Sequence, residues 1–133
     1  MSAELENQLA VLARTHHLDD IYVFGSRTRE MAAAVTGAEP VSEDPASDVD
    51  VGVQPERGYR LTARERVLVT LELEELLGVP RVDLVILPEA DAFLAAEIVR
   101  GELLYAQDLD QEAETQLYYL RRAGDLAPFF RER

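Results

Sequence analysis

Three short apolar segments, at residues 21–24, 49–53 and 82–87, constrain the fold of this chain more than any other feature. Each is rich in β-branched or aromatic residues and is bounded by turn-forming residues, which is typical of a strand. The stretches around them repeat apolar residues at helical spacing. Helices are therefore predicted at 2–16, 26–35, 61–77, 89–100 and 108–130, with a short edge strand at 103–105. Strands that alternate with helices predict an α/β fold, one small sheet covered by helices, in a single domain of residues 1–133.

Charge and composition narrow the classes of function. The formal net charge of −13 disfavours sequence-independent binding to duplex nucleic acid and favours divalent cations and basic protein partners. The chain contains no cysteine and no lysine, which excludes thiolate nucleophiles, cysteine zinc sites, lysine-containing phosphate loops and Schiff-base chemistry. No apolar run approaches the roughly 20 residues of a membrane span, and no signal peptide is recognisable. A cytoplasmic protein without membrane contact is expected.

The first candidate site feature is a Gly-Ser pair at the end of the first strand. Gly25 would let a ligand approach the backbone closely, and the helix predicted after Ser26 offers free N–H groups that suit a phosphate. Such pairs are also common in ordinary turns. Arg27 and Arg29, in the first turn of that helix, could contact phosphates or could pair with acidic surface residues.

The second feature is a pair of aspartates that opens the second strand. Alternation along a strand places Asp48 and Asp50 on the same face. Two neighbouring carboxylates repel each other unless water surrounds them or a cation lies between them. Oxygen ligands of this kind suit Mg²⁺, which often binds one or two carboxylates together with substrate phosphates. Both a solvated pair and a cation site are open interpretations.

The third feature is Asp83, within the otherwise apolar strand at 82–87. A carboxylate there needs a partner, such as Arg81, or a solvent-facing position on an edge strand. If this strand lies beside 49–53, Asp83 can face Asp48 and Asp50. Three clustered carboxylates could hold two cations and so favour phosphoryl or nucleotidyl transfer.

At these motifs the chain resembles the minimal nucleotidyltransferases of the DNA polymerase β superfamily. The resemblance lies in FGSRTR at 24–29, SDVDV at 47–51 and VDLV at 82–85, with a similar tail, IVRGELLY, at 98–105. It spans about residues 18–106. It implies the polymerase β-like nucleotidyltransferase fold, a small mixed sheet flanked by helices. Glu30, where the family has glycine, and an acidic loop insertion at about 37–47 depart from the family pattern.

The resemblance also implies roles for individual residues. The family's catalytic and metal-binding aspartates correspond to Asp48, Asp50 and Asp83, the last as ligand or base. The nucleotide-binding residues it implies are Gly25, Ser26, Arg27, Arg29 and Ser47. The expected cofactor is Mg²⁺, with ATP as the nucleotide donor.

The function implied by the resemblance is transfer of AMP from ATP to an acceptor hydroxyl. Many stand-alone members of the family are antitoxins that adenylylate a tyrosine of a HEPN-type RNase toxin, and a hetero-oligomer with that toxin is a possible assembly. Two alternatives stay open. One is a non-catalytic antitoxin that neutralises the toxin by binding. The other is an aminoglycoside-type nucleotidyltransferase, which would need an added substrate domain or a dimer.

Three further expectations concern packing. In the helix at 61–77, the apolar face is expected to comprise Val67, Leu68, Leu71 and Leu76. The histidines at 16 and 17 are expected to be exposed at a helix end, in preference to a metal site. The last helix carries aromatic residues and arginines that either pack on the sheet or form a partner surface: Tyr118, Tyr119, Phe129, Phe130, Arg121 and Arg122.

Overall fold

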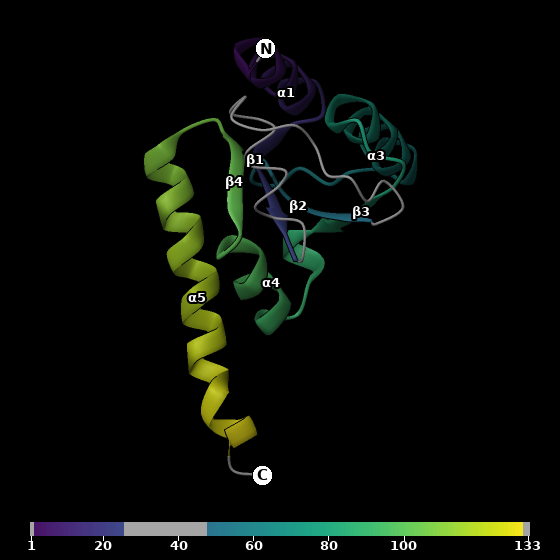
Figure 1. Cartoon of the computed structure of the whole chain (residues 1–133). Coiled ribbons are helices and arrows are strands. Elements are labelled where there is room, and N and C mark those ends of the chain that lie inside the picture. The colour runs from purple at the N-terminus through teal and green to yellow at the C-terminus, as the bar shows by residue number, and fades with distance from the viewer. Residues whose placement is uncertain (1, 26–47, 132–133) are drawn as a thin grey trace.

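The computed structural model describes residues 2–25 and 48–131 (Figure 1). The described elements are helices, strands and one 3-10 turn. In chain order they are α1 (Ser2–Thr15), β1 (Leu18–Phe24), β2 (Val49–Pro55), α3 (Ala63–Leu77), β3 (Val82–Ile86), the 3-10 turn η1 (Leu87–Glu89), α4 (Ala92–Val99), β4 (Glu102–Ala106) and α5 (Leu109–Arg131). The predicted alternation of strands and helices is confirmed for these residues. The helix expected at 26–35 and the insertion at about 37–47 lie outside the described residues.

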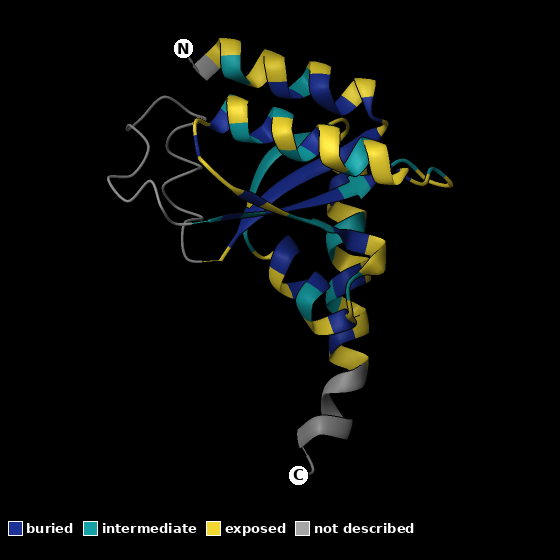
Figure 2. Cartoon of the chain, turned by 90° about the vertical axis from the view of Figure 1, so that its right-hand side faces the viewer, coloured by how far each residue is buried: buried dark blue, intermediate teal, exposed yellow. Residues whose placement is uncertain are grey.

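The strands form one mixed sheet in the order β3-β2-β1-β4. β1 runs antiparallel to both β2 and β4, whereas β2 and β3 are parallel. The helices α1 and α3 cover one face of the sheet, and α4 and α5 cover the other (Figures 1 and 2). The predicted mixed sheet flanked by helices is therefore confirmed, with 103–105 inside the edge strand β4.

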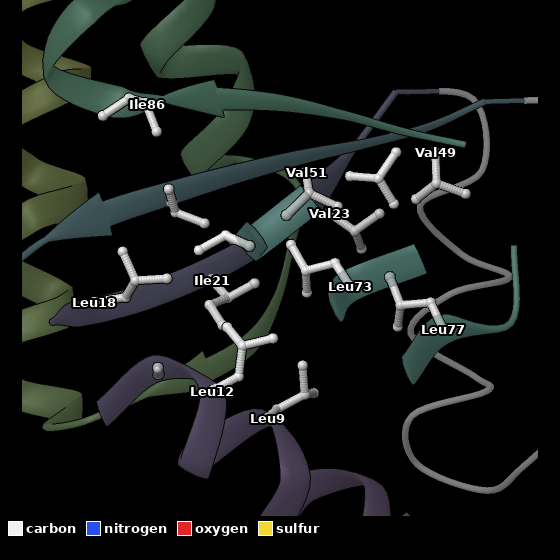
Figure 3. Close-up of a cluster of buried hydrophobic side chains, with 14 of the residues drawn as sticks. Leu9, Leu12, Leu18, Ile21, Val23, Val49, Val51, Leu73, Leu77 and Ile86 are labelled. Atoms are coloured by element: carbon white, nitrogen blue, oxygen red, sulfur yellow. The ribbon is translucent and has the colours of Figure 1, made fainter. Parts of the chain in front are cut away.

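Side chains alternate along β1, so this strand contributes to a hydrophobic cluster on each face of the sheet. Ile21 and Val23 point into the cluster under α1 and α3 (Figure 3), and Tyr22 and Phe24 point into the cluster under α4 and α5. Because both faces of the central strands are covered, β1 and the valines of β2 are buried throughout. Packing on both faces holds the central strands in place, and it also holds in place the residues directly at their ends.

The ends of α3 and α4 follow local chemistry. Thr62 and Glu65 form a reciprocal capping box at the start of α3, and Gly78 ends the helix in the left-handed region at φ 68°. Asp91 begins α4 by accepting hydrogen bonds from the N–H groups of Phe93 and Leu94. These caps determine where both helices begin and where α3 ends.

The predicted apolar face of α3 is wrong for Val67, Leu68 and Leu71, which are exposed, and right for Leu76, which is partly buried against the core. The residues it buries are Val69, Leu73 and Leu77, which recur every fourth position, whereas Val67 and Leu71 are exposed. The helix carries apolar residues around most of its circumference, so periodicity alone could not select the side that meets the sheet.

The predicted end of the first helix is also only partly right. β1 begins at Leu18, so Asp19 and Asp20 belong to the strand and are buried. His17 makes the connection with a φ of 58° and stacks on Tyr59, while its neighbour His16 is only 6% exposed. The expectation of exposure is thus wrong for His16, whose ring lies between α1 and α3, with Nε2 3.4 Å from Glu72.

The two tyrosines of α5 differ in burial: the packing role is confirmed for Tyr119, and a partner surface at Tyr118 stays a prediction. Tyr119 is buried and donates a hydrogen bond of 3.0 Å to Gln54 of β2. Tyr118 is exposed, with the Arg122 guanidinium 5.8 Å from its ring centre. The surroundings of Phe129 and Phe130 lie outside the described part of the chain.

Candidate active site

The candidate site lies where β1 ends and where β2 and β3 begin. Because β1 is antiparallel to β2, its last residue, Phe24, is paired with Asp50. Because β3 is parallel to β2, Asp83 is paired with the same Asp50. The strand order therefore collects Gly25, Asp50 and Asp83 at one end of the sheet, although they are far apart in the sequence.

The three aspartates share one face of this sheet end. Paired residues of neighbouring strands project to the same side, as do residues two apart along a strand. Asp48 and Asp50 are half-buried, and Asp83 is exposed. Asp83 thus has both properties considered for it, since it faces Asp50 and also occupies a solvent-facing position on an edge strand.

Electrostatic repulsion at this site falls mainly on Asp50. Burial raises the pKa of its carboxyl group, and the negative charges of Asp83, Asp48 and Glu97 raise the pKa further. Arg81 offers partial compensation, with its Nε 3.6 Å from an Asp48 carboxylate oxygen. Arg81 was considered as a partner for Asp83, but the ion pair that the structure shows is with Asp48. A bound cation would relieve the remaining repulsion.

Gly25 lies directly against Asp50. Its φ is +86°, a backbone conformation that residues with a side chain rarely adopt. A Cβ atom at this position would also lie 2.6 Å from Oδ2 of Asp50. Both the positive φ and the lack of room for a Cβ require glycine here. The backbone of Gly25 and the carboxylate of Asp50 therefore lie side by side at the site.

Helix α4 closes the site on one side through a second glycine. A Cβ on Gly52 would lie 2.4 Å from Cγ2 of Ile98, so the absence of a side chain lets α4 pack directly on β2. Glu97 precedes Ile98 and is the α4 residue whose charge acts on Asp50. Sequence reasoning missed Glu97, because nothing in its spacing from the aspartates distinguishes it from a surface residue.

Several residues expected at the site cannot be placed. Ser26, Arg27, Arg29 and Ser47 lie outside the described residues, as does Glu30. The described contribution to the candidate site therefore consists of Gly25, the three aspartates and Glu97, and the nucleotide-binding roles of the other four remain predictions.

The donor atoms at the site are of the kind that a hard divalent cation takes. Carboxylate oxygens are the usual protein ligands of Mg²⁺. The pKa of Asp50 is raised first by burial and then by the negative charges around it, which a cation would neutralise. Within residues 2–25 and 48–131, no three histidine or acidic side chains already stand in a metal-holding arrangement. The residues thus fit such a cation by chemistry and by position on the sheet.

Comparison with known families gives one match, and it covers most of the chain. A family model described as polymerase beta, nucleotidyltransferase, matches residues 6–110. None of the curated proteins compared matches the chain. None of the described helices has the length and apolar character needed to cross a membrane.

Solved structures show the same architecture. A toxin–antitoxin structure with AMP-PNP is 24% identical, with 96% of each chain covered and a TM-score of 0.59. A tri-AMPylated HEPN toxin in complex with an MNT antitoxin, from Shewanella oneidensis, is 22% identical over 99% of this chain and 98% of that one, with a TM-score of 0.57. A protein assigned as a minimal nucleotidyltransferase is 34% identical over 75% of this chain and 87% of its own, with a TM-score of 0.52.

Proposed function

Because this chain belongs to the polymerase beta nucleotidyltransferase family, we propose that it transfers AMP from ATP to a hydroxyl group of a protein acceptor. The observation that carries this proposal is the pairing of Asp50 with Asp83 directly beside Gly25. Carboxylates gathered against a close-approach glycine are suited to a nucleotide triphosphate and its cation. We further propose that residues 1–133 act as one nucleotidyltransferase domain.

The acceptor we propose is a tyrosine of a HEPN-type RNase toxin, which would make this chain an antitoxin. The similar solved structures include a toxin–antitoxin with AMP-PNP and an AMPylated HEPN toxin with its MNT antitoxin. The described residues form a single sheet with its helices, and they include no second domain to enclose a sugar-like substrate. This favours a separate protein acceptor over an aminoglycoside.

The aspartates that would hold Mg²⁺ are Asp48 and Asp50, with Asp83 completing the set. When bound, the cation would neutralise triphosphate charge and polarise the α-phosphate. Gly25 lets the phosphates approach the backbone, with Ser26, Arg27, Arg29 and Ser47 proposed as further contacts to the nucleotide.

We assign to Asp83 the role of accepting the proton from the acceptor hydroxyl. This residue is exposed at the sheet edge, where a large acceptor can reach it, whereas Asp50 is half-buried beside Gly25. In the proposed reaction the acceptor oxygen forms a bond to the α-phosphorus, the bond to the β-phosphate oxygen breaks, and pyrophosphate leaves.

The experiment mixes a HEPN-type RNase from the same organism with substoichiometric amounts of the chain, ATP and Mg²⁺. Intact-mass analysis should show the RNase gaining about 329 Da for each AMP attached by this covalent transfer, together with loss of RNase activity. Asp48→Asn should give neither effect.

A non-catalytic antitoxin is the alternative that the same experiment identifies. Inhibition would then need about one copy per RNase, would not need ATP and would survive Asp48→Asn. An unmodified yet inactive RNase would overturn the enzymatic proposal.

A further inference from the structure

A surface groove runs between helix α3 and strand β3, and we call it the α3–β3 groove. It has a volume of about 290 Å³. Val67 and Leu71 line it from the helix, and Asp83, Leu84 and Ile86 line it from the strand. Figure 1 shows α3 alongside β3, on the border of the sheet.

Four residues of α3 line the groove: Val67 and Leu71, which are apolar and exposed, Thr70, and Arg66, whose guanidinium is paired with Glu89. Val67 is 58% exposed and Leu71 is 56% exposed, and their spacing of four residues places both on one side of the helix. The face of α3 that packs on the sheet is a different one, formed by Val69, Leu73 and Leu77. The core of the chain therefore does not account for these two exposed side chains.

The strand side of the groove is an edge of the sheet. In the described sheet, β3 has only β2 as a neighbour, so its other edge has no strand partner, although the N–H of Val82 donates a hydrogen bond of 3.0 Å to the Glu74 carboxylate. Such an edge can accept an added extended strand, whose side chains then enter pockets beside it. An apolar wall next to a sheet edge suits an extended peptide better than a helix.

The groove is continuous with the candidate active site through Asp83. Asp83 lines the groove and is also the register partner of Asp50. From Ile86 to Asp83 the strand advances three residues, about 10 Å at roughly 3.3 Å per residue. Side chains alternate along β3, so Leu84 and Ile86 face α3 whereas Asp83 faces the side of the candidate site. A strand of three or four residues added at this edge would therefore place alternate side chains on the apolar wall and beside Asp83.

We propose that the α3–β3 groove binds an extended, basic segment of the protein acceptor and brings its target hydroxyl to Asp83. The inference rests on the proposed function, since it names where that acceptor binds. Asp83 is the carboxylate that lines the groove, and its register partner Asp50 lies beside it on the same face of the sheet, so positive charge is attracted to this end of the edge strand. A second copy of this chain is a poor occupant, because each copy carries a net charge of −13 and its own Asp83.

The first test measures docking without catalysis, with the same HEPN-type RNase as the probe. The chain contains no cysteine, so Leu71→Cys introduces a unique thiol in the groove. The matched control is Leu117→Cys on α5, because Leu117 is 54% exposed and lies on another face. With the thiols of the RNase blocked and no ATP present, the RNase should slow maleimide labelling at position 71 and leave labelling at position 117 unchanged.

The second test measures transfer. Leu71→Arg should raise the KM for the RNase by about tenfold or more, as expected for loss of one buried anchor residue. ATP affinity and thermal stability should stay as in the wild type, and Leu117→Arg should change none of these quantities.

The outcomes separate the docking site from the proposed function. Protection at position 71 with no AMP transfer by the wild type would overturn the proposed function and retain the docking site. Transfer by the wild type with an unchanged KM in Leu71→Arg would overturn the docking site alone. Protection at position 117 only, no protection at either position, or protection of position 71 by the chain alone at high concentration would also overturn it.

Discussion

Asp50 of β2 and Asp83 of β3 are partners in a parallel register, so their carboxylates leave the sheet on the same face and at the same level. Burial and the neighbouring negative charges together raise the pKa of Asp50. This arrangement therefore lowers the stability of the chain without a ligand. We infer that it serves to bind one.

Asp50→Asn should separate function from stability. We expect AMP transfer to fall by at least about 100-fold, because one group that holds the cation and nucleotide is lost. The melting temperature should stay the same or rise, because repulsion with Asp48 and Asp83 is removed. Transfer of radiolabelled AMP and thermal unfolding by circular dichroism measure the two effects. The exposed Asp110→Asn on α5 is the control, and activity of Asp50→Asn within a few-fold of wild type would exclude its assigned role.

Gly25→Ala can be compared with an internal control, Gly58→Ala. Both glycines have a positive φ, +86° and +81°, so both substitutions carry a similar backbone cost of about 1 kcal/mol. Only at Gly25 would the new Cβ meet Asp50, whereas nothing lies within 4 Å of the corresponding position at Gly58. Transfer should therefore be lost in Gly25→Ala and retained in Gly58→Ala. Equal activities would show that contact with Asp50 is unimportant.

ATP binding should require a divalent cation. Four acidic residues lie together at one end of the sheet: Asp48, Asp50, Asp83 and Glu97. Their charges, and the net charge of −13 of the whole chain, repel a triphosphate. Titration calorimetry should detect ATP binding with Mg²⁺ and little or none with excess EDTA. The same affinity in both conditions would argue against a cation held by these carboxylates.

Asp20 should make folding stability depend on pH. It is 1% exposed, and its Oδ2 has no hydrogen-bond partner within the described residues. Burial, and then the charges of Glu112 and Asp19, raises its pKa from 3.8 to about 7. Between these values the folded chain keeps a proton that the unfolded chain has released, so stability should fall as pH rises from about 4 to about 7.

Asp20→Asn removes this proton dependence. At pH 8 we expect the variant to be more stable than the wild type by on the order of 1–3 kcal/mol, and near pH 4.5 the two should be similar. Urea unfolding at several pH values measures the difference. Asp110→Asn should keep the wild-type slope, and an unchanged slope in Asp20→Asn would disprove the proposed linkage.

The gathering of the aspartates could be predicted because it depends on strand order and alternation. The valines of β2 and the apolar run of β3 identify two buried strands, and a parallel pairing between them places Asp83 beside Asp50. Gly25 follows in the same way from the end of β1. These are local patterns, and each is visible within a few residues of sequence.

The features that the sequence could not reveal depend on distant partners. Asp20 is buried under α5 beside Glu112, whose carboxylate accepts a 2.7 Å hydrogen bond from Tyr22, a residue 90 positions earlier in the chain. Packing against the sheet likewise determines which side of α3 is buried. Val69 and Leu73 face the sheet, whereas Val67 and Leu71 are exposed. Glu97 reaches the site only because Gly52 lets α4 approach β2.

The antiparallel pairing of Phe24 with Asp50 has a further consequence for recognising such chains. The sheet holds Phe24 and Asp50 together, on either side of residues 26–47, and each doubling of the length of a connection costs only about 0.6 kcal/mol in closure entropy. The number of residues between the glycine and the first aspartate is therefore a poor guide to their distance in space. A search pattern that fixes this gap would pass over chains whose strands still bring the two together.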